Sequence, residues 1–363
     1  STALVGLLGL ASLVPLLVVP LVGGAIADAH DRRTVLLWTE IGMAAVTALF
    51  LANALLSHPR VWLLFVLQAV AVSVFRLGRP AMSSLAPRLV PDDEIASAAA
   101  IEGVYGSLGA VAGPALGGVI IAFAGVPWTF GIDLATYLAS LGALGAGPKR
   151  PPREAVERPS VRSIVDGFRF LKGRQALIGI FVVDTNAMVF GMPSALFPAF
   201  ALHHLGGDAR TVGYLYAAPY AGALLGSLAS GWTAHVRRQG LSVTVAACTW
   251  GAAIAGFGFS RSLWPALALL AVAGGADFFS AVLRSTMLLR STPDRLRGRL
   301  QGIDFMQVAS APNLGDLAAG VLDSLTSLRF SIVSGGFLCI AGWALTVLLL
   351  PGFLHYDSRE PAA

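Results

Sequence analysis

Charged residues are scarce in this sequence. Asp, Glu, Lys and Arg make up 12% of its 363 residues, against about 25% in an ordinary soluble domain. Hydrophobic residues make up 56% of the chain, and the mean hydropathy is +0.74. A soluble protein of this composition could not cover its surface with polar groups. The composition therefore excludes the soluble classes and predicts an all-α polytopic membrane protein.

Cysteine and the usual motifs of catalysis are also scarce. The two cysteines, Cys248 and Cys339, lie in apolar runs without the Cys/His spacing of a metal site or a disulfide framework. The sequence contains no Gly-rich phosphate loop of the Walker type and no visible nucleophile triad. We therefore expect neither an enzyme nor direct ATP drive, and no cofactor or metal.

What the chain does contain is eleven apolar runs of about the length that a bilayer requires. They span Ala3–Ala27, Thr34–Leu56, Val61–Leu77, Ile95–Ala124, Val126–Gly147, Gln175–Leu205, Thr211–Ala234, Leu241–Ser260, Leu263–Leu288, Leu300–Leu325 and Arg329–Leu350. One long polar stretch, Pro148–Arg174, interrupts them. This pattern predicts an N-terminal half (1–147) with five helices, a linker (148–174), a C-terminal half (175–350) with six, and a tail (351–363).

The basic residues predict the orientation. Of the 25 Lys and Arg residues, 21 fall on alternate connections, Arg284 among them, and the other four are Arg60, Arg210, Arg261 and Arg329. By the positive-inside rule the richer set is cytoplasmic. The C-terminus is then cytoplasmic, and with eleven spans the N-terminus lies outside. Arg outnumbers Lys 23 to 2, which points to a GC-rich bacterial source.

The two halves repeat one another. A group of four residues in the first half recurs 202 positions later, which indicates parallel repeats. The four are Arg88, Pro91, Asp92 and Glu102, and their counterparts are Arg290, Pro293, Asp294 and Asp304. Because the first half lacks the counterpart of Gln175–Leu205, we expect about one further span before Ser1.

The linker ends in an amphipathic pattern. Apolar residues from Val161 to Leu171 follow helical spacing, and Ser160 can cap the start. This predicts a helix that lies on the inner leaflet. Its basic residues could also bind DNA, but the membrane interpretation is favoured, and we expect no nucleic-acid partner.

Small residues and a proline dominate one stretch of the fourth run. Glycine and proline weaken soluble helices, whereas in a membrane they let helices approach closely and bend. The pattern consists of Gly109, Gly113, Pro114, Gly117 and Gly118. It resembles the antiporter motif of the major facilitator superfamily, at every fixed position. The alternative is a generic packing seam of small residues.

The connection after the first run resembles the superfamily's signature loop. The matching positions are Gly24, Asp28, Arg32 and Arg33, whereas Ala29 and Asp31 depart from the pattern. The Asp28 carboxylate can pair with a nearby arginine, Arg79 or Arg76, or face a helix N-terminus. Such a latch forms in one state only and biases alternating access. The alternative is an ordinary basic loop.

Other segments narrow the resemblance to the enterobactin-exporter branch of the superfamily. They are Leu89–Glu94, Gly167–Leu171, Val212–Ala218 and Gly315–Asp316. The branch also contains macrolide and multidrug exporters. The resemblance implies two six-helix halves, here with the first helix missing, in a bacterial cytoplasmic membrane. It also implies export of a siderophore or drug.

Carboxylates inside the apolar runs are candidates for proton coupling. Charge is costly in a bilayer, and burial favours the protonated form of a carboxyl group. We expect Asp184 to be the coupling acid, then Asp316, with Asp277 a third candidate. The alternative for each is a structural carboxylate bonded to an arginine or a helix end.

Aromatic residues could line an apolar substrate cavity between the halves. The candidates are Tyr105, Tyr216, Tyr220, Trp250 and Phe278, although such residues also simply pack or face lipid. The sequence thus predicts a monomeric exporter of a small amphiphilic molecule, driven by inward proton flow, with only that substrate and the lipid bilayer as partners. A facilitator or importer on the same fold, or a membrane receptor or scaffold that transports nothing, remains the alternative.

Overall fold

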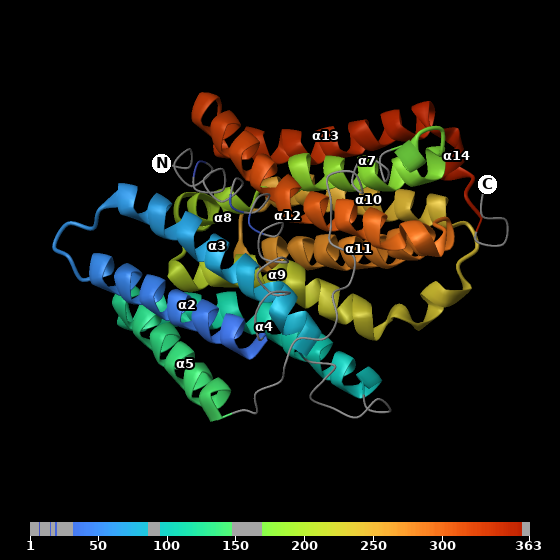
Figure 1. Ribbon diagram of the computed structural model, residues 1–363. Coiled ribbons are helices and arrows are strands. Elements are labelled where there is room, and N and C mark those ends of the chain that lie inside the picture. The colour runs from blue at the N-terminus through green and yellow to red at the C-terminus, as the bar shows by residue number, and fades with distance from the viewer. Residues whose placement is uncertain are drawn as a thin grey trace. The chain divides into compact units, whose positions relative to one another are not determined.

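The computed structural model describes residues 32–85, 95–146 and 169–357, together with Leu7, Pro15 and Val19. Within these ranges the elements are helices, and no strand occurs (Figure 1). The long helices are α2 (Arg32–Ala54), α3 (Val61–Leu85), α4 (Ile95–Ala124), α5 (Val126–Ala146), α7 (Gln175–Phe190), α9 (Ala209–Leu228), α10 (Gln239–Phe259), α11 (Leu263–Arg290), α12 (Asp294–Leu325) and α13 (Leu328–Leu349). Lipid offers no hydrogen-bond partners, and a helix satisfies its backbone N–H and C=O groups internally. The predicted all-α fold is confirmed.

Ten of the eleven predicted spans coincide with these helices, and six of the described helices are both long and apolar enough to cross a membrane. The first predicted span, Ala3–Ala27, lies outside the described residues except for Leu7, Pro15 and Val19. The predicted linker helix also lies outside them, apart from its last residues from Arg169 onward.

By their contacts, the residues separate into two compact units. The smaller comprises Leu8–Gly109 and Val119–Pro159. Its described part packs α2 against α3 and α5. Gly78 of α3 lies so close to α2 that a Cβ there would be 2.8 Å from Thr39 Oγ1. The rings of Phe50 (α2) and Phe130 (α5) stack 5.3 Å apart. Small residues and stacked rings thus bring these three helices together.

The larger unit comprises Ser1–Leu7, Ala110–Gly118 and Ser160–Ala363. In it α11 packs against α9 and α10, α10 against α13, and α7 against α12 and α13 (Figure 1). Glycines make the α9–α11 contact possible: a Cβ at Gly222 would collide with the backbone of Ala271, and one at Gly274 with Pro219. Such close backbone approach gives the van der Waals packing that holds helices together in a membrane.

The sixth predicted span, Gln175–Leu205, is not one continuous helix. Helix α7 ends at Phe190, and after Gly191–Pro193 the chain continues as η3 (Ser194–Leu196), α8 (Phe197–Ala199) and the π-helix η4 (Phe200–His204). Pro193 and Pro198 cannot donate backbone hydrogen bonds. Gly191 has no room for a side chain, because the indole ring of Trp250 lies against it. By length and composition Gln175–His204 is still one candidate span, but its helix is interrupted at Gly191–Pro193.

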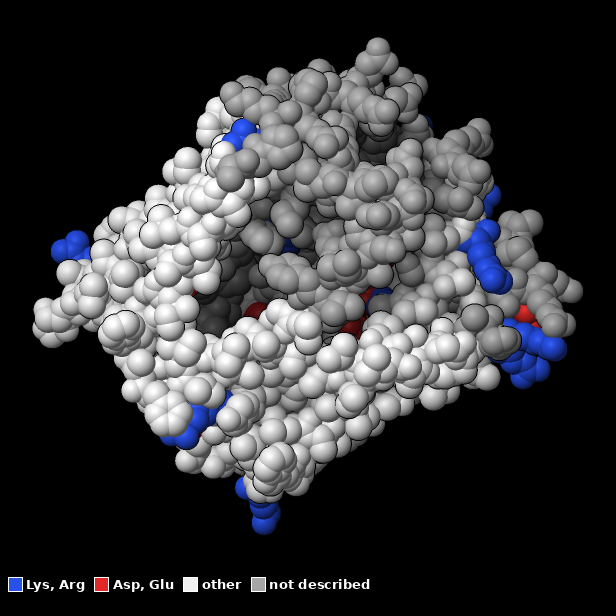
Figure 2. Space-filling view, turned by 90° about the horizontal axis from the view of Figure 1, so that it is seen from below, with Lys and Arg blue, Asp and Glu red and all other residues white. Residues whose placement is uncertain are grey.

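Charged side chains are sparse among the described residues on the face that Figure 2 shows, where broad areas are white and Lys and Arg occur at scattered points. Large apolar side chains are exposed, among them Trp264 and Leu228, each at 79%. Such a surface suits lipid and not water.

The remaining short helices lie in the larger unit. They are η5 (Ser230–His235), which follows α9, and α14 (Pro351–Leu354), which follows α13. Phe353 of α14 is fully buried against α7, where Gly179 leaves space for its ring. Helix α14 is thereby packed against the helices of this unit.

Candidate functional site

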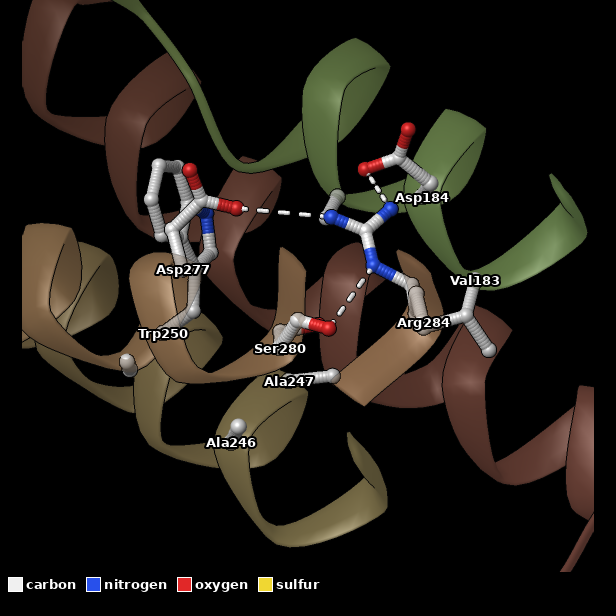
Figure 3. A pocket seen from close by; sticks show the side chains of 10 residues that line it. Val183, Asp184, Ala246, Ala247, Trp250, Asp277, Ser280 and Arg284 are labelled. Atoms are coloured by element: carbon white, nitrogen blue, oxygen red, sulfur yellow. Dashed lines mark hydrogen bonds and ion pairs between the residues drawn. The ribbon is translucent and has the colours of Figure 1, made fainter. Parts of the chain in front are cut away.

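A buried ion pair joins α7 to α11. Asp184 Oδ1 pairs with Arg284 Nη1, and the two side chains are 2% and 8% exposed (Figure 3). Asp184 Oδ2 accepts a hydrogen bond of 2.8 Å from Gln307 Nε2 on α12. Gln307 Nε2 also donates to the Phe181 carbonyl oxygen at 3.1 Å. Three helices therefore meet at Asp184, whose Oδ1 is in an ion pair and whose Oδ2 accepts a hydrogen bond.

A second acid shares the same arginine. Asp277, Ser280 and Arg284 lie three and four residues apart, so they occupy one face of α11. Arg284 Nε donates to the Ser280 carbonyl oxygen at 3.3 Å, and Nη2 lies 3.8 Å from Asp277 Oδ1. The Asp277 side chain is 42% exposed, much more than Asp184. The two acids are thus held unequally, Asp184 tightly and Asp277 loosely.

Arg284 corrects the sequence-based orientation count. It was counted with the cytoplasmic connections, but it lies within α11 and is buried. The signal was present in the sequence: Arg284 falls inside the predicted run Leu263–Leu288, seven residues after Asp277 and on its face. A charge within an apolar run needs a partner, and Asp277 at that spacing was the place to look.

An aromatic cavity of about 180 Å³ adjoins the ion pair within the larger unit. Tyr216, Tyr220 and Trp250, three of the five predicted cavity aromatics, line it together with Asp277. Trp250 and Asp277 also line the small space of about 10 Å³ beside the Asp184–Arg284 pair, at the lower limit for one water molecule. In Figure 3 the Asp277 carboxylate lies beside the Trp250 ring and points toward Arg284. Asp277 therefore connects the cavity with the ion pair.

Asp316 holds the broken helix. Its Oδ1 accepts a hydrogen bond of 2.7 Å from Ser194 Oγ and one of 2.8 Å from the Ala195 backbone N–H. The Ala195 N–H lies at the start of η3, where a backbone donor has no partner within its own helix, so the carboxylate caps this segment. Ser194 also lines the cavity, and its carbonyl oxygen accepts from the Tyr216 hydroxyl at 3.0 Å. Of the predicted acids, Asp184 and Asp277 thus share Arg284, whereas Asp316 accepts hydrogen bonds from the segment that follows the end of α7.

The other predicted site residues are dispersed. Phe278 does not line this cavity; its ring lies against Phe279 and near Gly226. Arg33 binds the end of α5, where its Nε donates to the Leu144 carbonyl oxygen at 2.8 Å. Gly24 and Asp28 and the side chains of Arg32, Arg79 and Tyr105 lie outside the described residues.

The residues of the small-residue motif lie on α4. Pro114 lies inside this helix, which continues past it. No described atom lies within 4 Å of a Cβ built at Gly109, Gly113 or Gly117. A Cβ at Gly118, in contrast, would lie 2.6 Å from the Ala209 carbonyl oxygen and 2.8 Å from Gly213 Cα, all within the larger unit. Gly118 is therefore the motif glycine for which the structure gives a steric reason.

Among the residues that the structure describes, no group of three or more His, Cys, Asp or Glu side chains could hold a metal ion. The chemistry available at the ion pair and the cavity is that of carboxylates, one guanidinium and aromatic rings.

The sequence is similar to that of known proteins over almost the whole chain. Residues 1–360 match the family model described as "Transmembrane secretion effector". The chain is 32% identical to the enterobactin exporter EntS of Citrobacter koseri over 345 residues, which are 94% of this chain and 82% of that protein. It is 30% identical to the enterobactin exporter EntS of Escherichia coli K12 over 343 residues, with the same shares.

Solved structures share the fold at low sequence identity. The nucleoside transporter NupG superposes with a TM-score of 0.76 at 13% identity, over 97% of this chain and 90% of that one. A bacterial homologue of the human lysosomal transporter Spinster superposes with a TM-score of 0.74 at 17% identity, over 98% and 90%.

Proposed function

Because the chain belongs to the transmembrane secretion effector family of major facilitator transporters, we propose that it exports a small amphiphilic molecule in exchange for protons. It is a multi-pass membrane transporter and not an enzyme. Export, proton exchange and alternating access are the proposal. The two relatives described above are named enterobactin exporters, which supports outward transport of a siderophore or a drug-like molecule.

The shared arginine carries the proposal of proton exchange. Each charge near the bilayer centre costs ~2.5–3.5 kcal/mol on insertion scales, yet Asp184, Asp277 and Arg284 are grouped inside one half. Pure packing would be served better by apolar residues, because a buried ion pair adds little net stability. A cluster with one carboxylate more than its cation can take up one proton and lose its net charge. That is the property that a proton-driven exporter needs.

The cavity beside the cluster supports an amphiphilic substrate. It combines the rings of Tyr216, Tyr220 and Trp250 with the Asp277 carboxylate. Apolar walls with a few polar groups are typical of sites for small molecules. Loading at this cavity would then be coupled to the cluster through Asp277.

The remaining parts of the proposed mechanism lie in the sequence motifs. We assign Asp28, with Arg79 as its partner, to a cytoplasmic latch, and the Gly109–Gly118 pattern to helix contacts that change during alternating access. The proton gradient is the driving force, without a cofactor. The transporter acts as a monomer in a bacterial cytoplasmic membrane with its C-terminus in the cytoplasm.

Everted membrane vesicles test this function. Vesicles containing the chain, energised by respiration, receive enterobactin, a macrolide and ethidium in turn. We expect accumulation of at least one of them, which collapses when an uncoupler dissipates the proton gradient. Vesicles without the chain are the control. Transport that survives the uncoupler would contradict proton exchange and indicate a facilitator, and the absence of transport of all three would contradict export of this class of substrate.

A further inference from the structure

We propose that Asp277 is the residue at which a proton and the substrate exclude one another, and that the substrate binds it through hydrogen-bond donors on an aromatic group. This inference rests on the proposed function and deepens it. Asp184 then has a different task, because it remains charged as the fixed counter-ion of Arg284.

The two acids beside Arg284 differ in how tightly their carboxylates are held. Asp184 is 2% exposed and receives bonds from both Arg284 and Gln307. Asp277 is 42% exposed, and its one described partner is the same guanidinium at 3.8 Å. A ligand could reach Asp184 only by displacing two partners, whereas Asp277 already opens into the cavity. Exchange of proton for ligand is therefore assigned to Asp277.

The surrounding groups fix the charge of the cluster. Asp184 faces it from α7, and Asp304 on α12 lies close enough to interact electrostatically with Asp184 and Arg284. Tyr216 and Tyr220 of α9 share the cavity with Asp277, and Trp250 contributes from α10. With both pairing acids ionised, Asp184, Arg284 and Asp277 carry one net negative charge. Protonation of Asp277 makes this trio neutral.

The lining of the cavity selects the chemistry of the ligand. Three of its donors are already engaged: Trp250 Nε1 donates to the Gly191 carbonyl oxygen at 2.8 Å, Tyr216 to the Ser194 carbonyl oxygen, and Ser194 Oγ to Asp316. The Tyr220 hydroxyl also lines the cavity and is a neutral donor. Asp277 is left as the charged acceptor. A negatively charged acceptor favours ligands that donate hydrogen bonds and repels carboxylates and phosphates. Phenolic hydroxyls and amino groups on aromatic rings both meet this requirement.

The exchange step balances in protons. A protonated Asp277 carboxyl group releases its proton to solvent, and the carboxylate accepts hydrogen bonds from the ligand's O–H or N–H groups. No bond within the ligand changes. Binding of one ligand thus displaces one proton, and by linkage protons weaken ligand binding to the same extent.

Proton release by the purified chain tests the inference. The chain in detergent is weakly buffered about one pH unit below the midpoint at which Asp277 titrates, where that carboxyl group is mostly protonated, and a pH-indicator dye is added. It is then mixed with enterobactin, which offers catechol hydroxyls, or with ethidium, which offers aromatic amines. Tetraphenylphosphonium, an aromatic cation without such donors, is the comparison. We expect close to one proton per bound ligand for whichever donor-bearing probe binds, and the two probes distinguish the phenolic source from the amine source. Binding of tetraphenylphosphonium as tight as that of both donor-bearing probes would overturn the donor requirement.

Two variants make the test specific. Asp277→Asn should bind the probe without releasing a proton, and its Kd should not change with pH. On the acid side of the Asp277 titration, the Kd of the unaltered chain should rise about tenfold for each unit by which the pH falls. Asp133→Asn, an acid on α5 that accepts a hydrogen bond from Thr47 at 3.2 Å, is the matched control and should release as the unaltered chain does. Size-exclusion profiles confirm that each variant is folded, and Asp277→Glu serves if Asp277→Asn does not fold, with altered but persistent proton release expected.

The outcomes separate the inference from the proposed function. Undiminished proton release by Asp277→Asn would overturn the inference. So would failure of the unaltered chain to bind either donor-bearing probe. In both cases the vesicle experiment decides independently whether gradient-driven export remains.

Discussion

Arg284 is held by two carboxylates of unequal accessibility, and this inequality is the most informative contact at the scale of single residues. The Asp184 contact is dry and reinforced by Gln307, whereas the Asp277 contact is longer and open to the cavity. Removal of one member of a buried pair leaves an uncompensated charge, which costs about 3–5 kcal/mol. Asp184 was singled out in the sequence because it is a carboxylate inside an apolar run. Its partner was missed, because counting basic residues by connection treats every arginine near a helix end as a loop residue.

The ion pair predicts a specific pattern of stability. Arg284→Gln should lower the stability of the folded chain by about 3–5 kcal/mol, because Asp184 would stay buried without its cation. The double variant Arg284→Gln with Asp184→Asn should recover part of that loss. Unfolding in detergent, followed by circular dichroism, measures both. Arg210→Gln, whose partner Asp208 is exposed, should change stability by about 1 kcal/mol or less. Equal effects of the two single variants would contradict the cost expected for a buried charge that has lost its partner.

At the scale of helices, two features shape the larger unit: the break after α7 and the glycine contacts between α9 and α11. The positions of ten helices followed from hydrophobic length, which is a strong signal in a membrane. The break was not predicted, because Gln175–Leu205 is largely apolar and a hydropathy pattern does not show where backbone hydrogen bonds of a helix are interrupted. Asp316 was predicted as a buried acid, but its partners Ser194 and Ala195 depend on how α12 packs against η3. The contact joins segments more than 100 residues apart, so no local sequence pattern predicts it.

The cap on the broken helix can be removed selectively. Asp316→Ala deletes the acceptor for Ser194 and the Ala195 N–H, and each lost bond to a charged group costs about 1.5–3 kcal/mol. We expect faster hydrogen exchange of backbone amides over 194–204, with little change in α10. Asp323→Ala, seven residues later on α12 and without a hydrogen bond or ion pair shown to another described residue, is the control. Unchanged exchange in Asp316→Ala would mean that the carboxylate does not hold the break.

The glycine contact predicts a packing defect on a small substitution. In Gly222→Ala the new methyl group would meet the Ala271 backbone, so α9 and α11 must separate, at about 1–3 kcal/mol. The thermal midpoint in detergent should fall accordingly. Gly302→Ala on α12 is the matched control, since no described atom lies within 4 Å of its Cβ, and it should be neutral or slightly stabilising. A midpoint for Gly222→Ala equal to that of Gly302→Ala would refute the close approach.

At the scale of the whole molecule, charge and hydropathy decide how the chain lies in the membrane. With Arg284 moved into α11, 20 basic residues still fall on one set of connections and four on the other. The prediction of a cytoplasmic C-terminus is thus unaffected by the correction. Composition alone predicted the membrane class, because no soluble arrangement can hide so much apolar surface.

Reporter fusions measure this orientation. Green fluorescent protein joined after Ala363 should fluoresce, and alkaline phosphatase joined there should be inactive, because each reporter folds on only one side of the membrane. Fusions that end at Arg261, on the sparsely charged side, should give the reverse result. Active phosphatase after Ala363 would show that the positive-inside assignment is inverted.

The proposed exchange of one proton at Asp277, beside Arg284, also has a consequence for how membrane voltage acts on transport. If one proton enters for each molecule that leaves, a neutral substrate moves one net charge inward per cycle, and ~2.3 kcal/mol per 100 mV is added to the driving force. A monovalent cation leaving in exchange for that proton moves no net charge, so its export depends on the pH difference alone. The same site would therefore expel a neutral phenol electrogenically and an aromatic monocation electroneutrally.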